Sequence, residues 1–218
     1  MTGIDDGIVS DRLHRVRDRI RSSGGRDVRL VAVTKGFGTD AVTAAVAAGI
    51  ADLGENYAQE MLGKVGGLPE VSDVRWHFLG RLQRNKVRAL AAHVHLWQSV
   101  DRVELGAEIA RRAPGAAVLV QVNLSGEPQK GGCAWGDLRS LVGQLQQLDL
   151  DVRGLMGVGP EGPPASARPG FRRLVKTADA LGLPERSIGM TADLEVAVEE
   201  GSTMVRVGRD LFGPRQPD

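Results

Sequence analysis

Lys35 has the residue type and the position of a reactive amine. It follows a short apolar run at residues 30–34, and Gly36 and Gly38 come soon after it. A short valine-rich run that leads into glycines is typical of a buried strand that ends in a turn. Most strand-end lysines are solvated charges. Partial burial, however, disfavours the ammonium form and makes the amine a nucleophile toward carbonyl carbons, so the sequence leaves both interpretations open.

Thr191, Gly208 and Arg209 are placed to bind a phosphate group. Thr191 follows the seventh of eight short apolar runs, and Gly208 and Arg209 follow the eighth, where a backbone amide can approach a ligand closely. In βα barrels, phosphate is often held by the loops after strands seven and eight. A turn that needs a positive φ is the simpler explanation of Gly208 alone. A phosphate-binding loop opposite a strand-end lysine favours a Schiff base, either with a carbonyl substrate or with pyridoxal phosphate (PLP).

Arg206 is a charged residue inside the last apolar run, residues 203–208. Alternation along a strand places its side chain on the opposite face from Val205 and Val207. A buried arginine needs a partner. The sequence offers two, an inward carboxylate such as Glu55 or the ring nitrogen of a ligand.

The apolar runs also predict the elements that position these residues. They alternate with helix-like stretches, which is typical of parallel strands joined by helices. Eight such units predict an α/β fold, a (β/α)8 TIM barrel that forms a single domain over residues 1–218, with an open doubly wound sheet as the alternative. The expected strands are residues 30–34, 52–55, 74–79, 94–100, 117–124, 151–158, 186–190 and 203–208. The other strand-end residues considered for a site are Asn56, Gly80, Arg81, Asn123, Ser125 and Met156.

The helix signals are strongest at the N-terminus, where an additional helix capped by Ser10 is expected before the barrel. Thr39 or Asp40 is expected to cap the helix that follows the first strand, and Gly49 to end it. The proline-rich segment 159–170 is long for a βα loop and is expected to be mobile. The expected helices with clear apolar stripes are residues 11–21, 134–147 and 171–181.

Composition and charge limit the classes of function. The 218 residues are 42% hydrophobic and 25% charged with a formal net charge of +1, so no overall field favours nucleic acid or an anionic membrane. No stretch has the length of a signal peptide or a membrane span, and a cytoplasmic protein is expected. Cys133 is the single cysteine, which excludes an internal disulfide and a cysteine metal cluster. His77 is expected to be a hydrogen-bonded core residue, and no metal site is expected.

Two short motifs are weak. The stretch GVGPEG at residues 157–162 matches G-x-G-x-x-G, but Pro160, Pro163 and Pro164 prevent the helix that a dinucleotide site requires. The basic stretch GRLQRNKVR at residues 80–88 is typical of a solvated helix face and is weak support for RNA or an acidic partner.

Seven motifs in order give the chain a resemblance to a known family. They are VAVTKG (31–36), GENYAQE (54–60), WHFLGRLQRNK (76–86), QVNLSGEPQKGG (121–132), RGLM (153–156), SIGMTADLEVAVEEGSTMVRVG (187–208) and LFGPR (211–215). Together they resemble the pyridoxal phosphate homeostasis protein family. Its barrel is similar to the N-terminal barrel of alanine racemase, fold type III of the PLP enzymes.

The resemblance implies a role for each candidate residue. Lys35 stands at the Schiff-base lysine, Arg206 at the arginine that faces the pyridine nitrogen, and Thr191 at a phosphate ligand that is usually serine. Gly208 and Arg209 stand where backbone amides bind phosphate. The positions that line the ring are Asn56 and Met156. Gly36 and Gly38 replace a bulkier turn, and Arg81 replaces a common proline, which affects loop shape only.

The expected function is therefore storage and delivery of PLP in intracellular PLP homeostasis. The expected partners are PLP and apo PLP-dependent enzymes, with no nucleic acid or membrane, and a monomer is expected. Racemase-type chains carry a further β domain that supplies a tyrosine, whereas this sequence ends soon after the eighth run and Tyr57 is its only tyrosine. No catalytic residue is assigned. The alternatives are a low-activity racemase or decarboxylase with its base on residues 159–170, a Schiff-base aldolase, and a protein-binding adaptor that uses residues 80–88.

Overall fold

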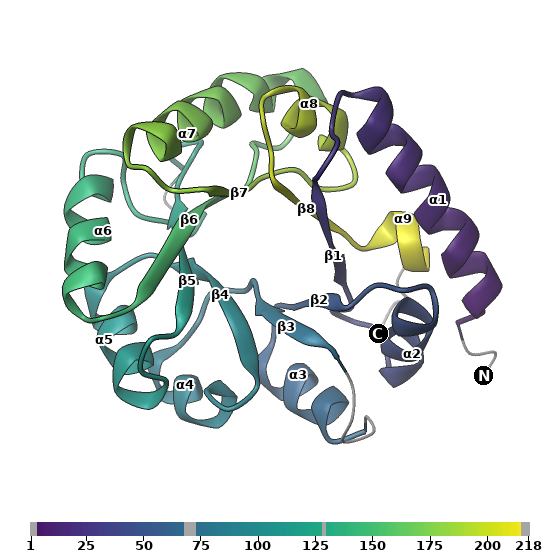
Figure 1. The fold of residues 1–218 in the computed structure, drawn as a ribbon, viewed down its shortest axis with the longest axis horizontal. Coiled ribbons are helices and arrows are strands. Elements are labelled where there is room, and N and C mark those ends of the chain that lie inside the picture. The colour runs from purple at the N-terminus through teal and green to yellow at the C-terminus, as the bar shows by residue number, and fades with distance from the viewer. Residues whose placement is uncertain (1–3, 68–72, 128–129, 215–218) are drawn as a thin grey trace.

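Eight parallel strands close into a barrel in the computed structural model, which describes residues 4–67, 73–127 and 130–214. Each strand pairs with the next in the chain, and β1 pairs with β8, so the sheet has no free edge (Figure 1). The strands are β1 (Arg29–Val33), β2 (Asp52–Glu55), β3 (Arg75–Phe78), β4 (Val94–Val100), β5 (Ala117–Val122), β6 (Asp151–Gly157), β7 (Glu185–Ser187) and β8 (Met204–Val207). The predicted TIM barrel is confirmed, and the open sheet is excluded because β1 and β8 are hydrogen-bonded.

The helices form a ring around the barrel (Figure 1). In the described residues they are α1 (Asp6–Ser22), α2 (Thr39–Ala47), α3 (Ala58–Val65), α4 (Arg84–Leu90), α5 (Val103–Arg112), α6 (Leu138–Gln147), α7 (Arg168–Ala180), α8 (Leu194–Glu199) and α9 (Arg209–Phe212), with a 3-10 helix η1 (Pro164–Ala167). The helix α1 precedes the barrel and packs against α2, α8 and α9. None of the described helices is long and apolar enough to cross a membrane.

The barrel interior is a packed core, separate from the larger core between strands and helices. Val31, Leu96, Leu119, Met156 and Met204 are buried together inside the barrel. Neighbours of these residues along the strands, such as Ala32 and Val205, belong to the outer core. This alternation follows from the two-residue period of a strand, and it places Arg206, two residues after Met204, on the interior side.

Two helix starts differ from the sequence prediction. The helix α1 begins at Asp6, and the carboxylate of Asp5 accepts a hydrogen bond of 3.1 Å from the backbone nitrogen of Ile8, so Asp5 and not Ser10 is the cap. Ser10 lies inside the helix. The cap of α2 is Gly38, one residue earlier than expected, whereas the predicted end of α2 is confirmed, since Gly49 has a positive φ of 80°.

Several other elements are shorter than predicted, each for a local reason. The strand β7 ends at Ser187 because Gly189 has φ 95°, which an extended strand does not have. The strand β5 ends at Val122, and the side chain of Asn123 then accepts from the backbone nitrogen of Gly126 and starts a turn. The helix α6 begins at Leu138, so the predicted start at residue 134 is wrong.

The segment 159–170 is not the structureless loop that its prolines suggested. It contains η1 and the first residues of α7, and Ala167 in η1 is buried in the main core. Pro164 stands at the start of η1, a position where a missing backbone donor costs little. The segment is therefore folded against the barrel.

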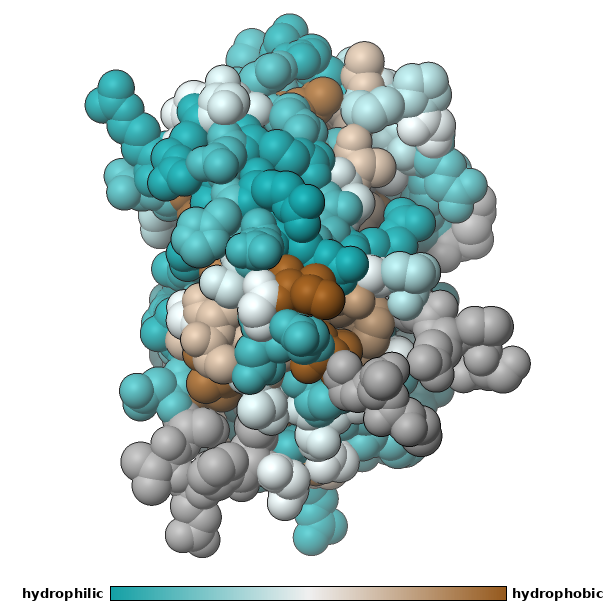
Figure 2. Space-filling model, turned by 90° about the vertical axis from the view of Figure 1, so that its right-hand side faces the viewer, coloured by the Kyte–Doolittle hydropathy of each residue, from teal (hydrophilic) through white to brown (hydrophobic). Residues whose placement is uncertain are grey.

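The outer surface of the barrel on the side of α1 is mainly hydrophilic. Figure 2 shows this face, with hydrophobic residues gathered in a limited area of it. Ile8 in α1 and Val46 in α2 are exposed large hydrophobic residues of these helices, 49% and 42% exposed. Scattered exposed apolar residues of this kind are normal on the surface of a folded domain.

Candidate functional site

A cavity of about 520 Å³ lies at the C-terminal ends of the strands. Its size falls within the range of about 300–1,000 Å³ that is typical of ligand pockets. All seven residues that the sequence analysis selected line it, namely Lys35, Asn56, Met156, Thr191, Arg206, Gly208 and Arg209. The remaining lining is apolar and comes from Val33, Leu79, Val158, Met190 and Ala192. Residues from six strand ends thus meet in one place, as expected of a βα barrel.

The backbone on both sides of Lys35 is held by the helix α3. The ammonium of Lys64 donates a hydrogen bond of 2.7 Å to the carbonyl oxygen of Thr34, and the backbone nitrogen of Gly36 donates one of 2.7 Å to the carboxylate of Glu60. Gly36 has φ 72°, a conformation that favours glycine. The position of Lys35 at the cavity wall is therefore fixed by its neighbours.

A buried ion pair lies behind Lys35. Lys64 pairs with Glu55, and the hydroxyl of Thr34 donates a hydrogen bond of 2.6 Å to the same carboxylate. Glu55 has no exposed surface, and Lys64 is 4% exposed. One of the two partners that the sequence offered for Arg206 is thereby excluded, because Glu55 is paired with Lys64 and Thr34.

Arg206 is held at the bottom of the cavity by neighbouring strands. Its Nη1 donates to both the carbonyl oxygen and the hydroxyl of Ser187, each at 2.6 Å, and its Nη2 donates to the carbonyl oxygen of Gly157 at 2.8 Å. Burial lowers the pKa of Arg206 to about 10, and the nearby carboxylate of Asp193 opposes this shift. The guanidinium therefore remains cationic at neutral pH.

The loop after β8 brings backbone amides to the cavity. Gly208 and Arg209 begin the short helix α9, whose first N–H groups have no partner within the helix. Gly208 has φ −119°, so the explanation by a positive φ is wrong. A side chain at this position would place its Cβ 3.1 Å from the carbonyl oxygen of Val33. The close approach of β1 is thus the reason for glycine here.

The charge of the cavity favours an anionic ligand. Among the described residues that line it, the titratable side chains belong to Lys35, Arg206 and Arg209, and all three are basic. The hydroxyl of Thr191 and the first amides of α9 add hydrogen-bond donors on the side of β7 and β8. An amine, a cationic interior end and a set of hydrogen-bond donors therefore share one cavity.

Comparisons with known proteins agree with this arrangement. The family model of the alanine racemase N-terminal domain matches residues 5–216. The pyridoxal phosphate homeostasis protein of Pseudomonas aeruginosa is 41% identical over 221 residues, which cover 95% of this chain and 96% of that protein. The chain belongs to the pyridoxal phosphate homeostasis family.

Solved structures support both the fold and the family. PipY of Synechococcus elongatus, solved with PLP bound, is 35% identical with a TM-score of 0.84, and the match covers 94% of this chain and 100% of that one. The alanine racemase of Streptomyces lavendulae is 21% identical with a TM-score of 0.73, covering 99% of this chain and 59% of that one. The racemase comparison shows the fold alone.

The sequence analysis of this family member missed Arg19 of α1. Its guanidinium donates to the carbonyl oxygen of Thr191 at 3.0 Å and to the carboxylate of Glu195 at 2.6 Å, and it also pairs with Asp210. It thus joins α8 and α9 to the loop after β7 from outside the cavity. The hydrogen bond of Glu195 is the main cause that raises the pKa of Arg19. An arginine on an amphipathic helix gives no signal of this role, because such residues are usually solvated.

Other residues considered from the sequence lie away from the cavity. The side-chain amide of Asn123 donates to the carbonyl oxygens of Glu127 and Lys130 and so shapes its own loop. Tyr57 precedes α3 and is 59% exposed. It lies with Arg81 and other residues around a neighbouring cavity. Burial raises the pKa of Cys133 to about 11, which agrees with an unreactive thiol.

Proposed function

We propose that the chain is a cytoplasmic PLP carrier, a single barrel domain over residues 1–218 that holds PLP as a Schiff base on Lys35 and acts in PLP storage and delivery. The observation that carries the proposal is the meeting of Lys35, Arg206 and the donors after β7 and β8 in one cavity. The names of the relatives and the PLP-bound structure of PipY support it. We propose that the protein acts as a monomer and delivers PLP to apo PLP-dependent enzymes.

The residues present fit three polar groups of PLP, which are its phosphate, its ring nitrogen and its aldehyde. The hydroxyl of Thr191 and the backbone amides of Gly208 and Arg209 would bind the phosphate, and Arg206 would face the ring nitrogen. The side chains along the ring are Asn56 and Met156. When bound, PLP would supply an aldehyde carbon, and the amine of Lys35 would be the nucleophile that holds it through a C=N bond, with loss of one water.

Arg206 disfavours strong catalysis by such a complex. A guanidinium cannot take a proton from the ring nitrogen, and its positive charge opposes protonation of that nitrogen. An unprotonated ring is a weaker electron sink. Racemases of this fold class work despite such an arginine, so the argument against catalysis depends on the second acid or base.

The alternative is a racemase or decarboxylase of low activity. Racemisation needs a second acid or base besides Lys35. Among the described residues that line the cavity, the other titratable side chains are two arginines, Arg206 and Arg209. The segment 159–170, proposed to carry such a base, offers Glu161, which is exposed and is not among the lining residues. The carrier is therefore the better supported function.

The deciding experiment is the absorbance spectrum of the purified protein with PLP, followed by borohydride reduction and peptide mapping. We expect a visible absorbance band and a label on Lys35. Lys35→Ala should lose both, and Lys176→Ala, a change at an exposed lysine of α7, should keep both. A label on another lysine would overturn the site. Racemisation above the background of free PLP would favour the enzyme.

A further inference from the structure

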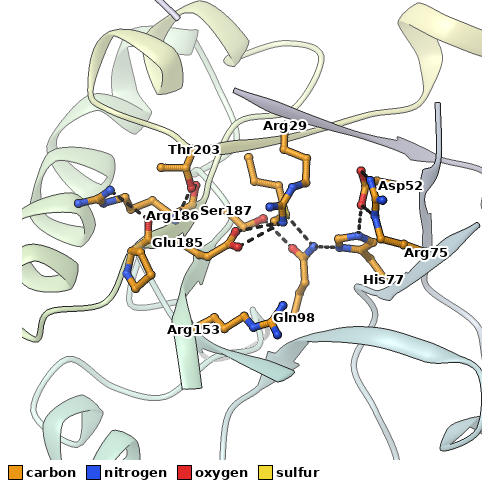
Figure 3. A network of polar contacts seen from close by, with 12 residues as sticks. Arg29, Asp52, Arg75, His77, Gln98, Arg153, Glu185, Arg186, Ser187 and Thr203 are labelled. Carbon is orange, nitrogen blue, oxygen red and sulfur yellow. Dashed lines mark hydrogen bonds and ion pairs between the residues drawn. The ribbon is translucent and has the colours of Figure 1, made fainter. Parts of the chain in front are cut away.

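A chain of buried polar side chains runs from the cavity across the barrel interior. Figure 3 shows Ser187, Gln98, His77 and Asp52 following one another, each from a different strand. Ser187, Gln98 and His77 have no exposed surface, and Asp52 is 6% exposed. Arg206 starts the chain at the cavity. Burial of a polar group is costly unless the group is hydrogen-bonded. The presence of these polar side chains inside the barrel therefore requires an explanation.

Each step of the chain is a hydrogen bond of 2.6–2.9 Å. Arg206 Nη1 lies 2.6 Å from Ser187 Oγ, and Ser187 Oγ lies 2.6 Å from Gln98 Oε1. Gln98 Nε2 lies 2.7 Å from His77 Nδ1, and His77 Nε2 lies 2.9 Å from Asp52 Oδ1. The interior of the barrel is thus connected continuously from β8 to β2.

All of these hydrogen bonds point in the same direction. An arginine side chain only donates, so Ser187 accepts from Arg206 and gives its own proton to Gln98 Oε1. The amide nitrogen of Gln98 then faces His77, whose Nδ1 accepts. His77 must carry its proton on Nε2 and donate it to Asp52. The guanidinium of Arg206 therefore fixes the tautomer of His77 through three successive hydrogen bonds.

A second contact supports this orientation of the Gln98 amide. Gln98 Nε2 also lies 3.0 Å from the sulfur of Met204, which has no proton to donate. A flipped amide would turn its oxygen toward this sulfur and toward Nδ1 of His77. His77 would then have to be protonated on both nitrogens, and the hydroxyl proton of Ser187 would lose Gln98 as its acceptor.

The surroundings of His77 also favour its neutral form. Burial lowers the pKa of His77, and the charge of Arg29 acts in the same direction, whereas Asp52 and Glu185 oppose the shift. The ring of His95 lies 6.0 Å from that of His77, and burial lowers the pKa of His95 as well. The groups that face His77 from β1, β2, β4 and β7 thus leave a neutral imidazole at neutral pH.

We propose that Ser187, Gln98 and His77 are positioning residues that hold Arg206 at the interior end of the cavity through this one-directional chain. Three of the five N–H groups of Arg206 have acceptors, and Ser187 supplies two of these through its carbonyl and hydroxyl oxygens. These hydrogen bonds fix the orientation of the guanidinium, so the direction of its remaining N–H groups is set by the protein before a ligand binds. The statement that Arg206 faces a cofactor ring rests on the proposed function. The chain of hydrogen bonds does not depend on that function.

The direction of the chain is tested on the protein without PLP, by nitrogen NMR of the histidine side chains. We expect His77 to show a protonated Nε2 and an unprotonated Nδ1, with His77→Gln identifying its signals. A proton on Nδ1 of His77 in the unchanged protein would overturn the proposal.

The positioning of Arg206 is tested with Ser187→Ala, which removes the hydroxyl and keeps the carbonyl. Ser166→Ala is the matched control, because the hydroxyl of Ser166 is exposed and bonds only to its own turn. We expect the guanidinium protons of Arg206 to exchange with water about fivefold faster in Ser187→Ala than in the control, as for one lost hydrogen bond. Equal exchange in the two variants would contradict the positioning role.

The same pair of variants links the chain to the ligand. Ser187→Ala should bind PLP about fivefold more weakly than Ser166→Ala. Unchanged binding in Ser187→Ala would contradict the positioning role. Failure of the unchanged protein to bind PLP would contradict the proposed function. The NMR and exchange results would still show whether the chain of hydrogen bonds exists and holds Arg206.

Discussion

Lys64 donates a hydrogen bond of 2.7 Å to the carbonyl oxygen of Thr34, the residue that precedes Lys35. The same ammonium pairs with the buried carboxylate of Glu55. One turn earlier in α3, Glu60 accepts from the backbone nitrogen of Gly36. A single helix therefore holds the backbone before and after the proposed Schiff-base lysine, through the buried ammonium of Lys64 and the partly exposed carboxylate of Glu60.

Replacing Lys64 with methionine should destabilise the protein strongly. Lys64→Met leaves Glu55 buried without its counter-charge, and the loss of one partner of a buried pair typically costs about 3–5 kcal/mol. Urea denaturation measures the change in the free energy of unfolding. Addition of Glu55→Gln to Lys64→Met should recover part of the loss. Lys176→Met, at an exposed position, should stay within about 0.5 kcal/mol of the unchanged protein, and similar losses in both lysine variants would contradict this role of Lys64.

Arg19 should contribute to binding of the phosphate without touching it. Arg19→Ala removes the hydrogen bond to the carbonyl oxygen of Thr191 and the contacts with Glu195 and Asp210, so the loops after β7 and β8 should be held less firmly. We expect about a tenfold rise in the dissociation constant of PLP, the equivalent of about 1.4 kcal/mol. Pyridoxal, which has no phosphate, should bind equally well to both proteins.

Arg15→Ala is the control for this prediction, because Arg15 is exposed on the same helix. Both dissociation constants should remain unchanged in this variant. An equal weakening of PLP and pyridoxal in Arg19→Ala would indicate general destabilisation instead of a role at the phosphate.

The strand ends were predictable from the sequence because a TIM barrel gathers them by topology. Lys35 and Arg206 stand out as charges next to or within apolar runs, and the eight-unit alternation implies that such positions share one end of the barrel. His77 was also correctly predicted to be a hydrogen-bonded core residue, since a histidine in the middle of a short apolar strand has few other options.

The supporting contacts were not predictable in the same way. Arg19 and Thr191 are 172 positions apart, and Gln98 and Ser187 are 89 apart. Periodicity identifies the face on which a side chain lies, but it does not identify which distant group that side chain meets. The cap of α1 was missed for a related reason, because Asp5 and Ser10 both have suitable side chains and only the geometry distinguishes them.

The two glycines after Lys35 should respond differently to alanine. Gly36 has φ 72°, where alanine is strained by about 1–2 kcal/mol, so Gly36→Ala should lower the free energy of unfolding. Gly38 has φ −77°, and a Cβ there would meet the flexible side chain of Asp40. Gly38→Ala should change stability by less than about 0.5 kcal/mol, because a weaker helix cap is offset by a less flexible unfolded chain.

Denaturation of the two variants side by side measures this difference. The amide of Gly36 is tied to Glu60 at 2.7 Å, so the turn is held and does not give Lys35 additional freedom. Equal stability of Gly36→Ala and Gly38→Ala would contradict the conformational argument.

His77 should make the stability of the protein depend on pH below its ordinary pKa of 6.5. Burial lowers the pKa of His77 in the folded state, so below pH 6.5 the unfolded chain binds one more proton at this residue than the folded protein does. The free energy of unfolding should therefore fall as the pH decreases from 6.5, by up to about 1.4 kcal/mol per pH unit from this group. His77→Gln keeps a donor and an acceptor but does not titrate, so the difference in stability between the two proteins should change with this slope.

His93→Gln is the matched control for the pH dependence, because His93 is exposed. Its stability should follow that of the unchanged protein at every pH. Chemical denaturation at a series of pH values between neutral and acidic conditions provides the comparison. A constant difference between the unchanged protein and His77→Gln across the series would show that His77 takes up its proton as readily in the folded state as in the unfolded chain, which its burial between Asp52 and Gln98 argues against.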